Sequence, residues 1–180
     1  MFDTDTFISS CVAAAGDREP RIAVKHVLAE AMADPAAVRR VLPPQRAEIV
    51  RLHVSPELTI LQVVWAPGMH FGPHDHRMWA AIGTYSGGED NAFYRRDGDS
   101  LVPSGGTSLR PGDVTLLGDD TIHAVTTPTA EYAGAIHIYG GDFFATARSE
   151  WRGAPYREQP YDVGGVLEYF EQANRRDSTP

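Results

Sequence analysis

Apolar residues follow helical spacing in the first 45 residues and strand spacing in most of the chain after them. Three short helices are predicted at the start, over 4–15, 21–32 and 35–42, each bounded by a capping residue, a glycine or a proline. Beyond them the apolar runs are short and are divided by turn residues such as Pro67-Gly68 and Asp97-Gly98. The predicted strands span 48–54, 59–65, 74–85, 91–96, 107–109, 113–117, 123–127 and 133–139.

About eight strands in succession, with no helix between them, are typical of an antiparallel sandwich or a closed barrel. A chain of 180 residues is long enough for one domain with a substantial core. We therefore predict a mainly β single domain in which helices occupy 1–45, the barrel 46–148 and an extension 149–180. A further helix is predicted within that extension, over 163–173.

Composition narrows the range of partners. Sixteen basic and 24 acidic residues give a net charge of −8, which argues against nucleic acid and anionic membrane surfaces. The N-terminus lacks the basic start and apolar core of a secretory signal, and no apolar run approaches the roughly 18 residues of a membrane helix. The single cysteine, Cys11, excludes an intramolecular disulfide. We therefore expect a cytoplasmic protein, either a monomer or a small homo-oligomer.

Three histidines form a candidate metal site. His74 and His76 flank Asp75 in a predicted strand, and residues two apart in a strand face the same side, so both imidazoles can meet one ion. His123, which begins a distant strand, is the candidate third ligand. The competing interpretation is that unrelated surface and core histidines occur here by chance. Imidazole ligands suit zinc, copper, iron and nickel, and a three-ligand face leaves positions open for catalysis.

The segments GPHDH and PGDVTLLGDDTIH resemble the two halves of the cupin pattern, over about residues 46–145. The run AIHIYGGDF makes the chain similar to the thiol dioxygenases, which are cysteine dioxygenase-like cupins. The resemblance implies a cupin double-stranded β-helix barrel, or jelly roll, with a small layer of N-terminal helices. It also implies Fe(II) as the cofactor, with His74, His76 and His123 as its ligands.

The family's activity is the oxidation of a small thiol by O2 to its sulfinate, here of cysteine or a mercapto-carboxylic acid. The resemblance implies that Tyr139 hydrogen-bonds to bound oxygen or to the substrate carboxylate, that His137 orients the Tyr139 hydroxyl, and that Trp65 belongs to the substrate site. Arg51 is the predicted partner of the substrate carboxylate, although it could equally be a solvent-facing arginine of its strand. Less favoured alternatives to it are Arg46, Arg77, Arg95 and Arg96.

Two positions depart from the animal enzymes of that family. Ala81 stands where those enzymes have a cysteine cross-linked to the tyrosine, and Ala135 replaces a serine two residues before the histidine of the H-x-Y element. These changes leave the identity of the thiol open. Two other classes also stay open: a different metal-dependent cupin enzyme, such as a carbon-substrate oxygenase or an isomerase, and a non-catalytic cupin that binds a small molecule.

Overall fold

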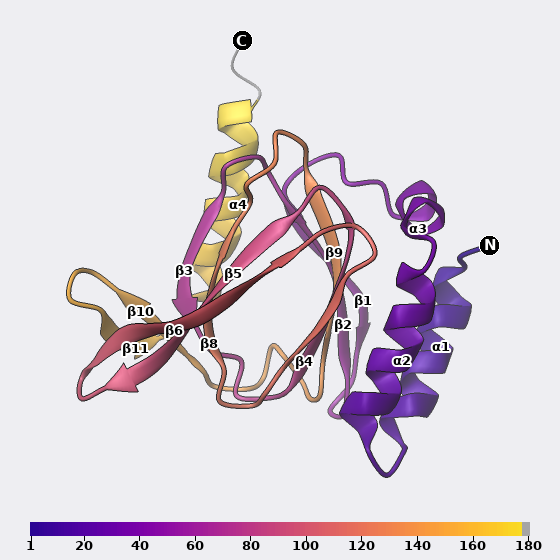
Figure 1. Cartoon of the computed structure of the whole chain (residues 1–180), viewed down its shortest axis with the longest axis horizontal. Coiled ribbons are helices and arrows are strands. Elements are labelled where there is room, and N and C mark those ends of the chain that lie inside the picture. The colour runs from indigo at the N-terminus through magenta and orange to yellow at the C-terminus, as the bar shows by residue number, and fades with distance from the viewer. Residues whose placement is uncertain (178–180) are drawn as a thin grey trace.

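The computed structural model describes residues 1–177, and it consists of two antiparallel sheets that face each other with helices outside them (Figure 1). The first sheet contains, in order, β1 (Glu48–Val54), β2 (Thr59–Trp65), β9 (Ala133–Tyr139), β4 (Ala80–Ser86) and β7 (Val114–Leu117). The second contains β11 (Arg157–Pro160), β10 (Ser149–Arg152), β3 (His70–His74), β8 (Ile122–Thr126), β5 (Glu89–Asp97) and β6 (Ser100–Leu109).

The strand pairing is that of one long hairpin rolled up between the two sheets. β5 pairs with β6, β4 with β7, β3 with β8 and β2 with β9, all antiparallel, and successive pairs alternate between the sheets. This arrangement is a jelly roll, or double-stranded β-helix. The predicted fold class is therefore confirmed.

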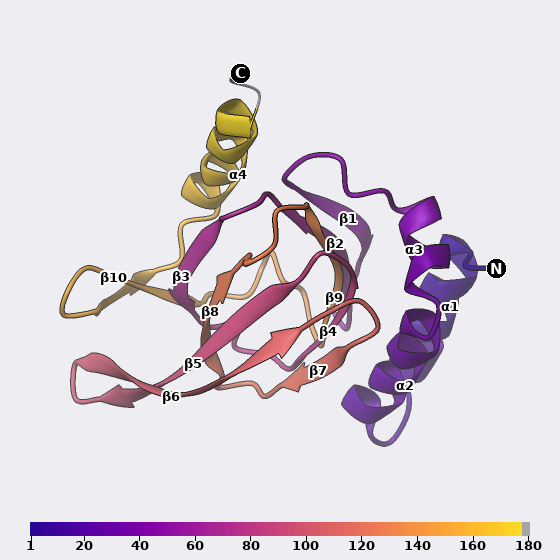
Figure 2. The ribbon, with the colours of Figure 1, turned by 45° about the horizontal axis from the view of Figure 1, so that its top comes forward.

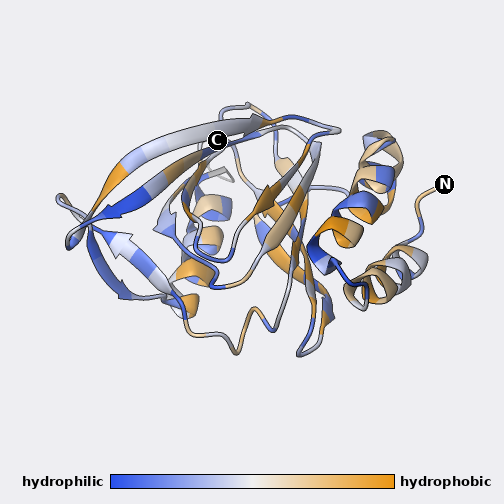
Figure 3. Ribbon diagram, turned by 60° about the horizontal axis from the view of Figure 1, so that its bottom comes forward, coloured by the Kyte–Doolittle hydropathy of each residue, from blue (hydrophilic) through white to orange (hydrophobic). Residues whose placement is uncertain are grey.

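Three N-terminal helices cover the outer face of the first sheet (Figure 2). They are α1 (Thr4–Ala15), α2 (Pro20–Met32) and α3 (Pro35–Val41), and their bounds lie close to those predicted. Asp3 caps α1 by accepting a hydrogen bond from the Thr6 backbone N–H at 2.8 Å, and Asp34 caps α3 in the same way. Apolar residues line the contact between helices and sheet, which Figure 3 shows in orange.

The fourth helix, α4 (Val163–Asp177), lies on the other side of the molecule, beside β3. It matches the helix predicted in the extension. Along the part of the chain that the structure describes, no helix is both long enough and apolar enough to span a bilayer.

The predicted strand over 74–85 is wrong. β3 ends at His74 in the second sheet and β4 begins at Ala80 in the first, so the chain crosses between the sheets over 75–79. Arg77 has a φ of 56°, which lies outside the extended range of a regular strand. The Asp75 carboxylate points away from its histidine neighbours, where it accepts a hydrogen bond from the Ser149 backbone N–H at 2.7 Å and pairs with Arg77. The crossing is thereby fixed to β10.

Other differences lie in the second sheet. Gly72 and Pro73, two residue types common in turns, lie within β3, and β6 begins at Ser100, seven residues earlier than predicted. Strands β10 and β11 were not predicted at all, and they add to the edge of this sheet. The extension that begins at residue 149 therefore contributes to the sheet, while its last three residues lie outside the described part.

A candidate metal centre in the barrel

The three predicted ligands come together between the sheets. The Nε2 atom of His76 lies 3.2 Å from Nε2 of His74 and 3.4 Å from Nε2 of His123, and all three side chains are buried. His74 and His123 are direct partners in the β3–β8 ladder, whereas His76 belongs to the crossing segment. The ligand atoms of the three lie within 4.8 Å of one another, which suits a shared metal ion.

Hydrogen bonds at the outer nitrogens orient two of these rings. Nδ1 of His74 lies 3.0 Å from the carbonyl oxygen of Gly72, which can only accept, so Nδ1 carries the proton and Nε2 is free. Nδ1 of His123 lies 2.7 Å from Oδ1 of Asn91. Such partners behind metal-binding histidines fix the ring and its tautomer.

Burial keeps the three imidazoles neutral. It lowers the pKa of His74 to about 4, against a smaller opposing effect of the Gly72 hydrogen bond and with help from the positive charge of Arg148. Burial also lowers the pKa of His76 and of His123 well below the usual value. Neutral imidazoles have the free lone pair that a metal ion needs.

These shifts predict that the metal-free protein loses stability as the pH falls from 7 to 5. Well above pH 6.5 neither the folded nor the unfolded state binds protons at these histidines. Around and below that pH the unfolded chain binds protons, whereas the buried rings of the folded state stay neutral. His74, with its pKa of about 4 in the folded state, alone corresponds to a loss of about 3 kcal/mol by pH 4. Urea unfolding across this pH range measures the change.

The variant His74→Asn should show a shallower fall over the same range, because one buried titrating ring has been removed. A free energy of unfolding that stays constant between pH 7 and pH 5 would contradict the assignment of neutral, buried rings.

The histidines open onto a cavity of about 30 Å³, which has room for little more than one or two water-sized groups. Most of its walls are apolar. His137 and Tyr139, two residues apart on one side of β9, both line it, and the Tyr139 hydroxyl lies 3.1 Å from Nδ1 of His137. The full lining is Ile49, Leu61, Val63, Trp65, Phe71, His74, His76, His123, Val125, His137, Tyr139, Phe143, Tyr161, Val166 and Phe170.

The structure does not bring Arg51 into this lining. Arg51 lies on β1, two residues after Ile49, but its side chain is exposed and its guanidinium lies 3.8 Å above the ring of Phe144. In the β1–β2 ladder it is the partner of Leu61, which does line the cavity, and its assignment as the carboxylate partner stays a prediction. The alternatives Arg46, Arg77, Arg95 and Arg96 are also absent from the lining.

A different arginine, which the sequence analysis missed, lies beside the cavity. Arg148 is 8 % exposed, and its guanidinium lies 3.8 Å from the ring centre of Phe143 and 4.1 Å from that of Tyr161, two residues of the lining. Its Nη1 donates to the carbonyl of Phe143, but among the residues that the structure describes Nε and Nη2 have no hydrogen-bond partner and are buried. Only its place nine residues after Tyr139 could have drawn attention to it.

Glu89 and Asn91, which the sequence analysis also missed, lie behind the ligands. The Glu89 side chain is fully buried and accepts hydrogen bonds at 3.1 Å from the indole N–H of Trp65 and from the Asn91 amide. Burial by itself raises the pKa of Glu89, but His137, Asn91 and Trp65 outweigh it and lower the pKa, so the carboxylate is ionised. Alternation along β5 places Glu89, Asn91 and Phe93 on one face, which was the available signal.

The position next to Tyr139 differs from that expected. Ala80, not Ala81, is the partner of Tyr139 in the β4–β9 ladder, and Ala81 packs among the residues that contact the helices. Both positions are alanine, and Cys11 belongs to the helical layer, so no thiol adjoins Tyr139.

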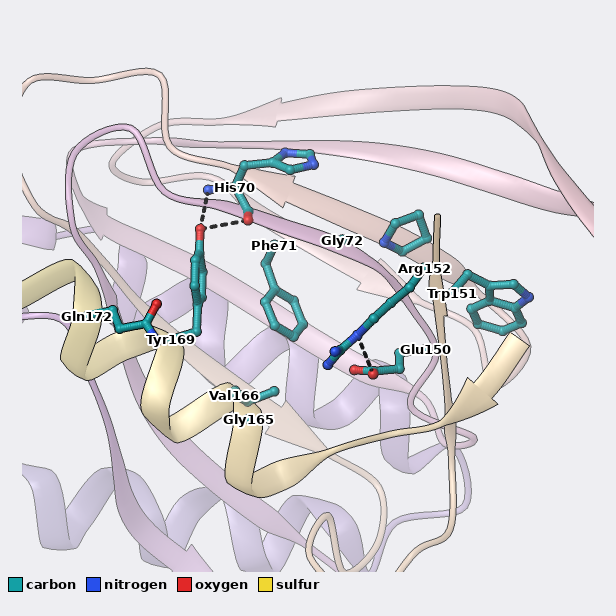
Figure 4. Close-up of a pocket in the computed structure, with 11 residues that line it drawn as sticks. His70, Phe71, Gly72, Glu150, Trp151, Arg152, Gly165, Val166, Tyr169 and Gln172 are labelled. Atoms are coloured by element: carbon teal, nitrogen blue, oxygen red, sulfur yellow. Dashed lines mark hydrogen bonds and ion pairs between the residues drawn. The ribbon is translucent and has the colours of Figure 1, made fainter. Parts of the chain in front are cut away.

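A larger pocket of about 340 Å³ lies on the surface between β3, β10 and α4 (Figure 4). It shares Phe71 and Val166 with the inner cavity, so these two side chains form a wall between them. The Tyr169 hydroxyl holds α4 to β3 by donating to the His70 carbonyl at 2.7 Å. The surface pocket therefore adjoins the metal centre without being part of it.

No protein-family model matches the chain. Among solved structures it is similar to the DMSP lyase DddQ from Ruegeria pomeroyi (20 % identity, TM-score 0.46, 57 % of this chain and 50 % of that one). It is also similar to the cupin domain of Schizosaccharomyces pombe Cnp3 (9 %, 0.47, 57 % and 68 %). A third is an uncharacterized conserved protein with a double-stranded β-helix domain from Klebsiella pneumoniae (15 %, 0.46, 58 % and 82 %).

The chain spans about half the length of the DMSP lyase that it matches. At these identities and scores the likenesses add no argument about activity. The fold assignment depends on the strand pairing, and the function has to be argued from the site.

Proposed function

We propose that the protein is an iron-dependent dioxygenase that oxidises a small thiol carrying a carboxylate, such as cysteine or a mercapto-carboxylic acid, to its sulfinate. The observation that carries this proposal is the joint placement of two groups at one small cavity and of a third beside it. Three neutral histidines converge on one point, and the His137–Tyr139 pair lies with them in the lining. Arg148 packs against the lining residues Phe143 and Tyr161, and among the described residues two of its buried nitrogens have no hydrogen-bond partner.

The donor set fits a divalent transition metal, because three buried Nε2 atoms converge and hydrogen bonds hold the outer nitrogens of His74 and His123. An iron(II) ion held there would supply the redox chemistry by which both atoms of O2 are added to a thiol sulfur. The chain's own contribution is orientation and exclusion of water. Apolar walls surround the reacting groups, and Tyr139 offers one hydroxyl that His137 holds in place.

The proposed substrate class follows from the small size of the cavity and from charge. The cavity, of about 30 Å³, is smaller than a thiol substrate, so the side chains that line it have to move to admit one. Arg148 is held between two aromatic rings, and its free Nε and Nη2 form the side of the guanidinium that binds a carboxylate in a bidentate manner. Buried N–H groups of a guanidinium that lack a hydrogen-bond acceptor are costly, and an anionic substrate would relieve that cost.

The direct test is O2 consumption by iron-loaded protein with a panel of thiols: cysteine, mercapto-carboxylic acids of different length, and cysteamine. We expect uptake with a carboxylate thiol, with one sulfinate formed for each O2 consumed. Metal binding without uptake for any thiol would overturn the proposal and favour another metal-dependent cupin activity. Absence of metal binding would favour a binding protein.

The two arginines give opposite predictions for the carboxylate contact. Replacing Arg148 with methionine should raise the KM for an acidic thiol by roughly 10- to 100-fold, because a charge-assisted hydrogen bond is worth about 1.5–3 kcal/mol. Oxidation of cysteamine should change little. Arg51→Met is the matched variant, and steady-state kinetics of both variants with both thiols measure the difference.

A selective loss with Arg51→Met and none with Arg148→Met would instead support the contact predicted from the sequence. Equal impairment of both thiols by Arg148→Met would reduce Arg148 to a structural residue that holds Phe143 and Tyr161.

A further inference from the structure

Glu89 joins the two sheets at the back of the site. It begins β5 in the second sheet, yet its carboxylate contacts residues of the first: Oε2 accepts from Trp65 of β2 and lies 3.8 Å from Nε2 of His137 in β9. Its other oxygen, Oε1, accepts from Asn91 within its own strand. Two series of contacts, here called arms, therefore start at this ionised, fully buried carboxylate. The first arm runs through Asn91 to His123, and the second runs through His137 to Tyr139.

The first arm has a defined direction. A carboxylate only accepts hydrogen bonds, so Asn91 must turn its NH2 group toward Glu89 and its carbonyl oxygen toward His123. That oxygen also only accepts, so Nδ1 of His123 must carry the ring proton. Nε2 of His123, which faces the other two histidines, is then unprotonated and free for a metal.

The second arm is directed in the same way. Among the described residues, Nε2 of His137 has no hydrogen-bond partner, and the Glu89 carboxylate is the acid that faces it. A proton on Nε2 is therefore favoured, which leaves Nδ1 to accept from the Tyr139 hydroxyl. Position 135, two residues before His137 on the same face of β9, is alanine and cannot supply this contact.

We propose that Glu89 is the positioning residue of the site: its carboxylate sets the proton on Nδ1 of His123, through Asn91, and the proton on Nε2 of His137. Glu89 touches neither the metal position nor the substrate cavity, and it acts only through these neighbours. The inference rests on the proposed function for the roles of His137 and Tyr139, but the tautomers themselves are properties of the metal-free protein.

The tautomers can be read directly from the side-chain nitrogen signals of the metal-free protein by NMR. We expect His123 to be protonated at Nδ1 and His137 at Nε2. The reverse assignment for either ring would overturn the proposal for that arm. No thiol and no O2 enters this measurement, so its outcome is independent of whether the protein is a dioxygenase.

Glu89→Gln tests the direction of the first arm. Trp65 is an obligatory donor, so the glutamine oxygen should stay with Trp65 and its NH2 group should face Asn91. Asn91 must then turn over and donate to Nδ1 of His123, which moves the ring proton to Nε2. We expect this change in the NMR signals and a roughly 10- to 100-fold weaker affinity for Zn²⁺, measured by competition with a chelator.

Adding Asn91→Asp to Glu89→Gln should restore both signals and affinity, because the aspartate accepts from the glutamine NH2 group and from His123 together. Asp90→Asn is the matched control: it removes one acidic charge from the neighbouring residue, whose carboxylate pairs with Arg110 at the surface, and should leave Zn²⁺ affinity unchanged.

Unchanged tautomers and affinity in a folded Glu89→Gln protein would reduce Glu89 to a packing residue. A folded double variant that fails to regain affinity would overturn the directional account. If Glu89→Gln alone does not fold, the wild-type spectrum and the double variant still decide the question.

Discussion

Replacing His123 with alanine should remove most of the metal from the purified protein and abolish its activity, while the barrel stays folded. Two histidines remain, and loss of one ligand of three exposes the ion to competition from solvent and chelators. The core between helices and sheet does not involve the site, so folding should persist. Metal analysis together with circular dichroism measures both parts of the expectation.

His70→Ala is the matched control, because His70 lies on β3 with His74 but is exposed, and its side chain bonds to Thr126. It should keep the metal content of the wild type. Full metal occupancy in His123→Ala would show that His123 is not a ligand.

Tyr139→Phe should keep the metal but lower turnover by roughly 10- to 1000-fold, as for other single polar groups placed at a reacting centre. The ring and its packing against His76 and Phe143 are retained, and only the hydroxyl is lost. His137→Ala should behave similarly, because the hydroxyl then loses the nitrogen that holds it. Steady-state rates of iron-loaded proteins, with metal content measured in parallel, provide the test.

Rates equal to the wild type in both variants would make His137 and Tyr139 ordinary packing residues of β9. A loss in Tyr139→Phe alone would keep the hydroxyl in the reaction and remove His137 from it.

The sequence was most informative where one residue pattern has one structural meaning. Alternation of apolar residues gave most strands, and capping aspartates and prolines gave the helices close to their observed bounds. The three candidate ligands were grouped for a partly wrong reason. His74 and His76 do not share a strand, and they meet because the chain crosses between sheets just after His74. Short apolar stretches do not reveal such a crossing.

Residues whose role depends on distant contacts were not predictable. Arg148 lies in a segment without periodicity, and only the folded chain shows that its guanidinium is buried beside the cavity. Glu89 looks like any charged residue at the start of a strand until Trp65 and His137 are seen to surround it. Arg51 shows the converse, because its position on the first strand suggested the cavity and its side chain is exposed.

The pairing of His74 with His123 in the β3–β8 ladder also determines when the metal centre can form during folding. These strands are distant in sequence, and contacts of that kind form late because the intervening loop must first be closed. An unfolded chain offers the neighbouring pair His74 and His76 without His123, so it should bind the metal more weakly than the folded site, and metal should not guide folding. Metal should act after folding, by slowing the unfolding of the two sheets. At a free concentration 100 times its dissociation constant it would raise the free energy of unfolding by about 2.7 kcal/mol.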